Sequence, residues 1–163
     1  MASGDTIAMF EARQAIPPSS NYATPSTRNG HPTLLFDDTT SETTYFRGVV
    51  PRNYAGGNVV VYVHHSAVSA TSGTGGWLIA FERIGDGSQD IDSDGFASDQ
   101  TITAVTVPGT SGNVDILSVS VTAGAATDSI AAGELFRLKV ARDTANDTAT
   151  GDLELHAVEL KEA

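Results

Sequence analysis

Short runs rich in β-branched and aromatic residues recur along the chain, separated by clusters of Gly, Pro, Asn, Asp and Ser. In many runs apolar and polar residues alternate with a period of two, which is typical of strands with one face in a core and the other in water. Two runs are almost wholly apolar, residues 59–63 (VVVYV) and 77–81 (WLIAF). They predict a pair of buried strands within the segment 58–84, joined by a flexible connection.

The same pattern predicts about nine strands at the spacing typical of β-sandwiches. In the run 135–142 we expect the apolar residues Phe136, Leu138 and Val140 to face the core. The charged residues Arg137 and Lys139 should face water. The other strand candidates are 6–10, 33–37, 43–50, 101–107, 113–122 and 152–161. The sequence therefore predicts one all-β domain over residues 1–163, a two-sheet antiparallel sandwich. A jelly roll is the most economical topology, and an immunoglobulin-like one is the alternative.

Residues 1–32 differ from the rest, because turn-forming residues dominate after the first apolar run. Pro17, Pro18, Pro25 and Pro32 each lack a backbone donor, which argues against a long helix or a central strand. We therefore expect a short edge strand followed by an extended arm that lies over a sheet edge or a neighbouring subunit.

Composition narrows the classes of function. The 163 residues carry a net charge of −11, which disfavours binding to nucleic acid and to anionic membranes. There is no cysteine, so disulfides and thiolate metal sites are excluded. No secretion signal and no apolar run near the roughly 20 residues of a membrane helix is visible. We expect synthesis in a cytoplasm.

The acidic segment 85–99 (GDGSQDIDSDGFASD) is the sharpest local signal. Asp90, Asp92 and Asp94, followed by Gly95, have the spacing that opens a calcium-binding loop. The twelfth position of such a loop is Thr101 rather than the usual glutamate. Calcium binding is thus one hypothesis, and a solvated acidic loop without a cofactor is the other.

The adjacent residues His64 and His65 should face opposite sides of a strand and so cannot share a metal ion. His31 or His156 could join one of them, although ordinary strand positions explain all four. The chain has no Gly-x-Ser-x-Gly elbow, phosphate loop or His-Glu-x-x-His motif. We therefore expect a protein that is not an enzyme.

The aromatic residues allow a sugar-stacking platform or plain core packing. Trp77 opens an apolar run, so we expect it in the core. Tyr22 and Tyr54 stand in turn-rich segments, and we expect them to be exposed or at an interface.

Four segments resemble a group of small phage- and prophage-associated structural proteins. They are SSNYATPSTRNGHPTLLFDD (19–38), VVPRNYAGG (49–57), GWLIAFERI (76–84) and AAGELFRLKVARDTANDTATGDLELHAVEL (131–160). The resemblance covers most of the chain but includes no catalytic motif.

That resemblance implies a jelly-roll subunit of a virion, made in the host cytoplasm, that decorates the capsid or forms a head fibre. It also implies a homo-oligomer, commonly a trimer, with a capsid or other virion protein as partner. The candidate interface residues are Tyr22, Arg28, His31 and Tyr54. The alternative is a carbohydrate-binding module or receptor-binding adhesin of the same fold, with a glycan as ligand.

Overall fold

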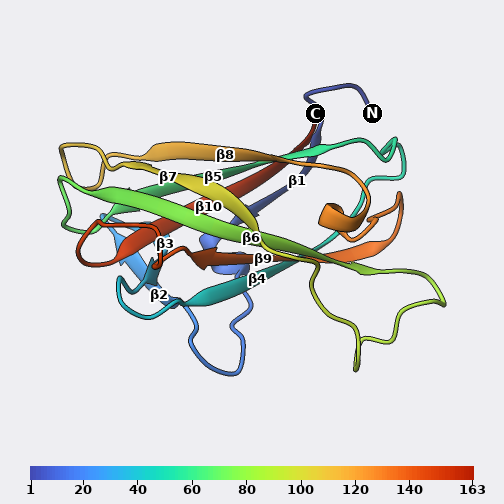
Figure 1. The fold of residues 1–163 in the computed structure, drawn as a ribbon, viewed down its shortest axis with the longest axis horizontal. Coiled ribbons are helices and arrows are strands. Elements are labelled where there is room, and N and C mark those ends of the chain that lie inside the picture. Colours follow the sequence, from blue (N-terminus) through green and yellow to red (C-terminus); the bar gives the residue numbers. More distant parts are fainter.

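The computed structural model describes all residues, 1–163, as ten strands and two short 3-10 turns (Figure 1). No helix is long and apolar enough to span a membrane. The elements in chain order are β1 (Thr6–Glu11), η1 (Ala12–Gln14), β2 (Thr24–Arg28), β3 (His31–Phe36), β4 (Thr43–Val49), β5 (Val59–Ala67), β6 (Thr74–Ile84), β7 (Gln100–Thr106), β8 (Asp115–Val121), η2 (Ala125–Thr127), β9 (Leu135–Arg142) and β10 (Leu153–Glu162).

The strands form two antiparallel sheets that pack face to face as a sandwich. Sheet A has six strands in the order β2-β3-β10-β5-β8, with β1 also paired to β10. Sheet B has four strands in the order β4-β9-β6-β7. This confirms the predicted all-β sandwich of jelly-roll type. The predicted central pair is correct as two strands, but β5 and β6 lie in different sheets and do not pair with each other.

The core lies between the sheets and is built from the inward positions of the alternating strands. Trp77 is fully buried and meets the ring of Phe36 edge-on, with ring centroids 4.9 Å apart. Phe136, Leu138 and Val140 are also fully buried, as the alternation predicts. Burying such a side chain stabilises a fold by about 1.5–3 kcal/mol, so these residues supply a large share of the driving force for folding.

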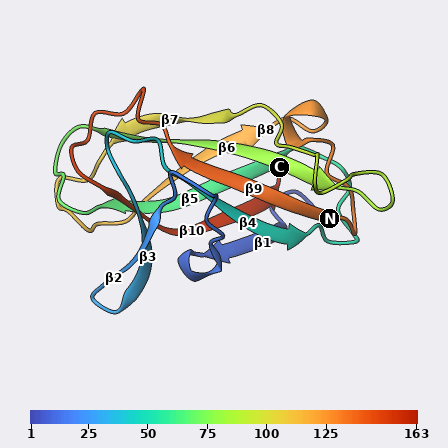
Figure 2. The same ribbon diagram turned by 90° about the horizontal axis from the view of Figure 1, so that it is seen from below.

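The N-terminal segment is part of the sandwich, which corrects the prediction of an extended arm. β1 pairs with β10, and β2 pairs with β3 to form a hairpin that projects from one end of the molecule (Figure 2). The prolines fit these places, because Pro25 lies in the edge strand β2 and Pro32 lies where β3 has no partner on its β10 side. The sequence did not predict β2 as a strand because its residues (TPSTR) show no alternation of apolar and polar side chains.

One edge of β10 is divided between two partner strands, and this division positions the candidate site. Residues Leu153–Leu155 pair with β3, whereas residues Ala157–Lys161 pair with β1. Between them the register of β10 against β5 shifts by a β-bulge at His156. Bulges bend a strand and re-aim a side chain, so His156 leaves the regular alternation of β10.

A loop packs on part of sheet B, and apolar side chains are exposed on the sides of both sheets. The last residues of the connection 85–99 pack on sheet B, where the ring of Phe96 lies 5.1 Å from that of Tyr45 and 4.9 Å from the guanidinium of Arg137. Asp99 also pairs with Lys139 at 2.6 Å. On the side of sheet A, Met9, Val114 and Ile116 are 53–62% exposed, and on sheet B Val49 and Val105 are 56% and 45% exposed.

Candidate functional site

The outer face of sheet A is laid out in rows by the strand register. Tyr62 of β5 lies between Glu159 of β10 and Ser118 of β8. In the next row His64 lies between Ala157 and Ile116. His65 points inward and is 1% exposed, so the predicted opposite orientation of the two adjacent histidines is confirmed.

A groove of about 530 Å³ opens on this face, beside the turn of the β2–β3 hairpin. Three of the four histidines of the chain line it, each from a different strand, and the fourth is His65 in the core. The complete lining is Arg28, Asn29, His31, His64, Gly112, Val114, His156 and Ala157. Segments far apart in sequence therefore converge on one surface hollow.

Arg28 fixes the hairpin turn over the sheet. Its Nη1 donates to Glu154 Oε2 at 2.8 Å and to the backbone oxygens of Ala67 and Val68 at 3.2 and 3.3 Å. Because these partners lie on β10 and at the end of β5, the arginine reaches past β3 and β10. A Cβ atom at Gly112 would lie 2.7–2.8 Å from Cζ, Nη2 and Nε of Arg28, so only glycine leaves room for the guanidinium there.

A short hydrogen-bond chain sets the tautomer of His156. The hydroxyl of Ser66 donates its single proton to Glu154 Oε2 at 2.9 Å, since the carboxylate of the Arg28 pair is an acceptor. The Nε2 of His156, 2.8 Å from the same hydroxyl oxygen, must then carry a proton and donate. Nδ1 is left with its lone pair. The imidazole accepts the serine proton in a nucleophilic Ser-His pair, so this arrangement does not activate Ser66.

Burial lowers the pKa of two imidazoles, those of His156 and His65. Burial lowers the pKa of His156, and Arg28, His31 and His64 add to the effect while Glu154 opposes it. In the core, burial lowers the pKa of His65 to about 4. At neutral pH the groove therefore offers a neutral His156 that can donate and accept hydrogen bonds with hydroxyl groups.

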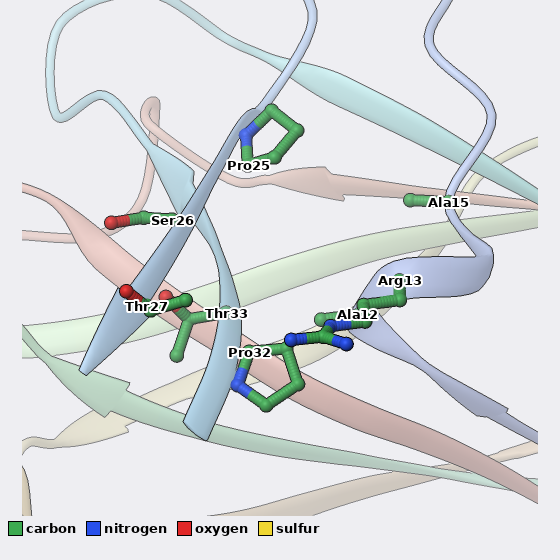
Figure 3. Close-up of a pocket in the computed structure, with 8 residues that line it drawn as sticks. All are labelled: Ala12, Arg13, Ala15, Pro25, Ser26, Thr27, Pro32 and Thr33. Carbon is green, nitrogen blue, oxygen red and sulfur yellow. The ribbon is translucent and has the colours of Figure 1, made fainter. Parts of the chain in front are cut away.

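A second cavity, of about 620 Å³, lies between η1 and the β2–β3 hairpin (Figure 3). Its lining is mostly small or cyclic side chains, with Arg13 of η1 extending towards Pro32 and no other charged residue. The hydroxyl of Thr33 is buried there without a hydrogen-bond partner. This cleft has no aromatic ring and no polar network, so it is the weaker candidate for a ligand site.

The four residues predicted at an interface lie in different places in the structure. Arg28 and His31 come together in the groove. Tyr22 is 49% exposed, as expected, but lies in the connection before β2, away from the groove residues. Tyr54 is only 7% exposed and donates its hydroxyl proton to the backbone oxygen of Gly57, so the prediction that it is exposed is wrong.

The acidic loop does not gather its carboxylates into a cluster. No group of three or more His, Cys, Asp or Glu side chains in the structure is arranged to hold a metal ion. Asp90 turns back on its own loop, accepting from the backbone N–H of Asp92 at 3.0 Å and, through its carbonyl, from that of Asp94 at 2.8 Å. Calcium binding by Asp90, Asp92 and Asp94 stays a prediction, which a calcium titration would test.

Sequence reasoning overlooked Ser66 and Glu154, and it mentioned His156 only as a possible partner of another histidine. Alternation along β10 places Glu154 on the outer face, yet it is 4% exposed because Arg28 covers it. The bulge at His156 interrupts the alternation that would have revealed this face. The one available signal was the concentration of three charged or imidazole side chains in residues 154–159.

Comparison with known proteins identifies solved structures of similar fold. No family model and no curated protein matches the chain. Among solved structures, the C-terminal CBM6 of LamC, a marine laminarinase from Zobellia galactanivorans, matches with a TM-score of 0.54 and 12% identity over 95% of this chain and 98% of that one. The CBM22-1 xylan-binding domain of Paenibacillus barcinonensis Xyn10C matches with a TM-score of 0.53 and 11% identity over 100% and 99%.

A third match is CBM6cm-2 from Cellvibrio mixtus lichenase 5A, solved in complex with cellotriose. Its TM-score is 0.51 and its identity 13%, over 98% of this chain and 99% of that one. All three matches span nearly the whole of both chains, so the similarity concerns the complete fold. None of the three is a phage protein, and identities this low establish the shared fold alone.

Proposed function

We propose that this protein is a carbohydrate-binding module that binds a glycan on the outer face of sheet A. The observation that carries the proposal is the groove beside the β2–β3 turn, where His31, His64 and His156 meet on an open sheet face. The fold similarity to several carbohydrate-binding modules supports it.

The open face offers the two kinds of contact that a sugar needs. Tyr62 and His64 stand two residues apart on β5 and point the same way, so their rings can pack against the apolar faces of successive sugars. Hydroxyl groups can exchange hydrogen bonds with the imidazoles and with Asn29 of the hairpin turn. On sheet B the one outward tyrosine, Tyr45, is already packed against the ring of Phe96.

Affinity electrophoresis against soluble polysaccharides tests the proposal. The wild type should be retarded by at least one of xylan, mixed-linkage β-glucan and laminarin, or by an acidic polysaccharide in the same panel. Tyr62→Ala and His64→Ala should each weaken that binding by about tenfold, the effect of losing about 1.4 kcal/mol from a binding hot spot.

Tyr22→Ala is the matched control, because Tyr22 is an exposed tyrosine outside the groove. It should leave retardation unchanged, and thermal melts should show that all variants are folded. No retardation by any polysaccharide, or equal effects of Tyr62→Ala and Tyr22→Ala, would contradict the proposed site.

The virion role implied by the sequence resemblance is the second proposal. A glycan-binding jelly roll on a virion surface would be compatible with both. Copurification with phage particles, or rebinding to particles that lack the protein, tests the virion role directly. The trimer, the capsid partner, the virion location and the lack of enzymatic activity stay predictions until such measurements.

A further inference from the structure

We infer that the groove selects glycans bearing a carboxylate, that is, chains containing uronic acid, and that Arg28 receives this carboxylate. The inference rests on the proposed glycan-binding function and adds the chemical class of the ligand. The supporting observations are the hydrogen bonds that Arg28 donates to the protein and the two of its nitrogens that have no protein partner.

Arg28 is anchored through one nitrogen only. Nη1 makes every hydrogen bond that the side chain has with the protein, to Glu154, Ala67 and Val68. Nε and Nη2 have no protein partner, and the side chain is 34% exposed. The Nε–Nη2 edge of a guanidinium carries two parallel N–H groups that match the two oxygens of a carboxylate.

The glycine at position 112 keeps this edge free of side-chain cover. A Cβ there would lie 2.7–2.8 Å from Cζ, Nη2 and Nε of Arg28, so any other residue would press its side chain against the edge that carries the two free nitrogens. Arg28 is also fixed before a ligand arrives, so less side-chain freedom is lost on binding.

The charges around the groove favour an anion, although the protein as a whole is acidic. The net charge is −11, yet Arg28 and the three imidazoles are the only ionisable groups in the groove lining. The nearest carboxylate, Glu154, is buried and already accepts hydrogen bonds from Arg28 and Ser66. Glu11 faces the lining residue Ala157, and Glu159 lies beside Tyr62 in the next row. The contact that attracts an anion is therefore confined to Arg28 at the hairpin turn.

Matched pairs of polysaccharides isolate the contribution of the carboxylate. One pair is polygalacturonate and its fully methyl-esterified form, and the other is glucuronoxylan and the same xylan after removal of its glucuronic acid. Isothermal titration calorimetry at pH 7 should show that the wild type binds the acidic member of at least one pair at least about tenfold more tightly than its neutral partner.

Arg28→Lys tests the role of the arginine while keeping a charge beside Glu154. A lysine ammonium can pair with Glu154 but lacks the parallel N–H edge, so the preference for the acidic member should fall to within about twofold. The readout is the ratio of the two affinities, because Arg28 lines the groove that holds either member. Arg13→Lys is the matched control, because Arg13 lines the other cleft and makes no ion pair; it should keep the full preference. Thermal melts check that both variants are folded.

The outcomes separate this inference from the proposed function. Equal binding of both members in each pair would overturn the uronate selectivity and leave glycan binding standing. Preference for the acidic member that survives Arg28→Lys would overturn the role of Arg28. Binding to no member of either pair and to no neutral glycan would overturn both the inference and the proposed function.

Discussion

Arg142 is a buried cation on which the connection between β9 and β10 depends. It is fully buried, and its guanidinium bonds to the backbone oxygens of Phe36, Ala149 and Gly151 at 2.7–3.1 Å. The remaining donors reach the carboxylate of Asp147, at 2.5 and 3.3 Å. All five N–H groups thus have hydrogen-bond acceptors, and these bonds offset the desolvation cost of burying the charge.

Replacing Arg142 with methionine should lower the free energy of unfolding by about 3–5 kcal/mol, because Asp147 and three carbonyl oxygens would stay buried without partners. Urea denaturation at pH 7 measures the loss. Arg47→Met is the control, since Arg47 is exposed on β4 and should change stability by less than about 0.5 kcal/mol. A loss below about 1 kcal/mol for Arg142→Met would contradict this role.

His65 makes stability depend on pH in the acidic range. Its folded-state pKa, about 4, lies below the unfolded value of 6.5, so the unfolded chain takes up a proton first. Stability is therefore full above pH 6.5 and falls as the pH drops towards 4, by about 3 kcal/mol at most. The lowered pKa of His156 acts in the same direction. Denaturant titrations at pH 7 and pH 4.5 should show a smaller drop for His65→Leu than for wild type; equal drops would contradict the assignment.

At the scale of elements, Gly48 of β4 packs directly against two core rings from neighbouring strands. A Cβ there would lie 2.9 Å from the ring of Phe136 on β9 and 3.1 Å from that of Phe10 on β1. Both rings belong to the core, so neither can move without disturbing other contacts.

Gly48→Ala should therefore destabilise the protein by about 1–3 kcal/mol, the usual effect of overpacking. Gly109→Ala is the matched control, because nothing lies within 4 Å of a Cβ at that position. Thermal unfolding of both variants against wild type measures the difference. A Gly48→Ala protein as stable as its control would show that β1 and β4 are less tightly packed than described.

The sequence predicted most strands because those strands bury one face and therefore alternate. Phe136, Leu138 and Val140 are examples, and the burial of Trp77 also followed from its apolar neighbours. The β2–β3 hairpin escaped prediction because β2 is an edge strand of polar residues (TPSTR), in which burial imposes no pattern. The alternation of apolar and polar residues also could not predict which strands pair. For example, β10 lies between β3 and β5, which are distant from it in the sequence.

The candidate site was predictable only in part, since it depends on contacts between distant segments. The opposite directions of His64 and His65 follow from a two-residue period. The meeting of Arg28 with Glu154, 126 positions later in the sequence, follows from the course of the whole chain. The place of His156 depends on a bulge formed where β10 changes partner, which no local pattern records.

At the scale of the molecule, the groove places one guanidinium in an acidic protein. Guanidinium groups stay protonated in proteins, and a uronate stays ionised until about pH 4. The preference for polygalacturonate over its methyl ester should therefore be the same at pH 7.5 and pH 5.5. Calorimetry at both pH values measures this, and a preference that is lost at pH 5.5 would argue against contact between Arg28 and the carboxylate.

A measurement of the oligomeric state of the whole molecule distinguishes the virion role from the glycan-binding role. The virion proposal predicts a stable trimer, which size exclusion with light scattering would detect as three times the 16.9 kDa chain mass. A monomer would count against the trimer and leave the glycan-binding proposal unaffected, because the groove is complete within one chain.

The most direct test of glycan binding on sheet A is an NMR titration of the ¹⁵N-labelled protein. The titrant is an oligosaccharide cut from the polysaccharide that binds best. Chemical-shift changes should concentrate at the β2–β3 turn and at outward residues of β5, β8 and β10, with His64 and His156 among the largest. Changes confined to the cleft around Arg13 or to sheet B, or no changes at saturating sugar, would contradict the account.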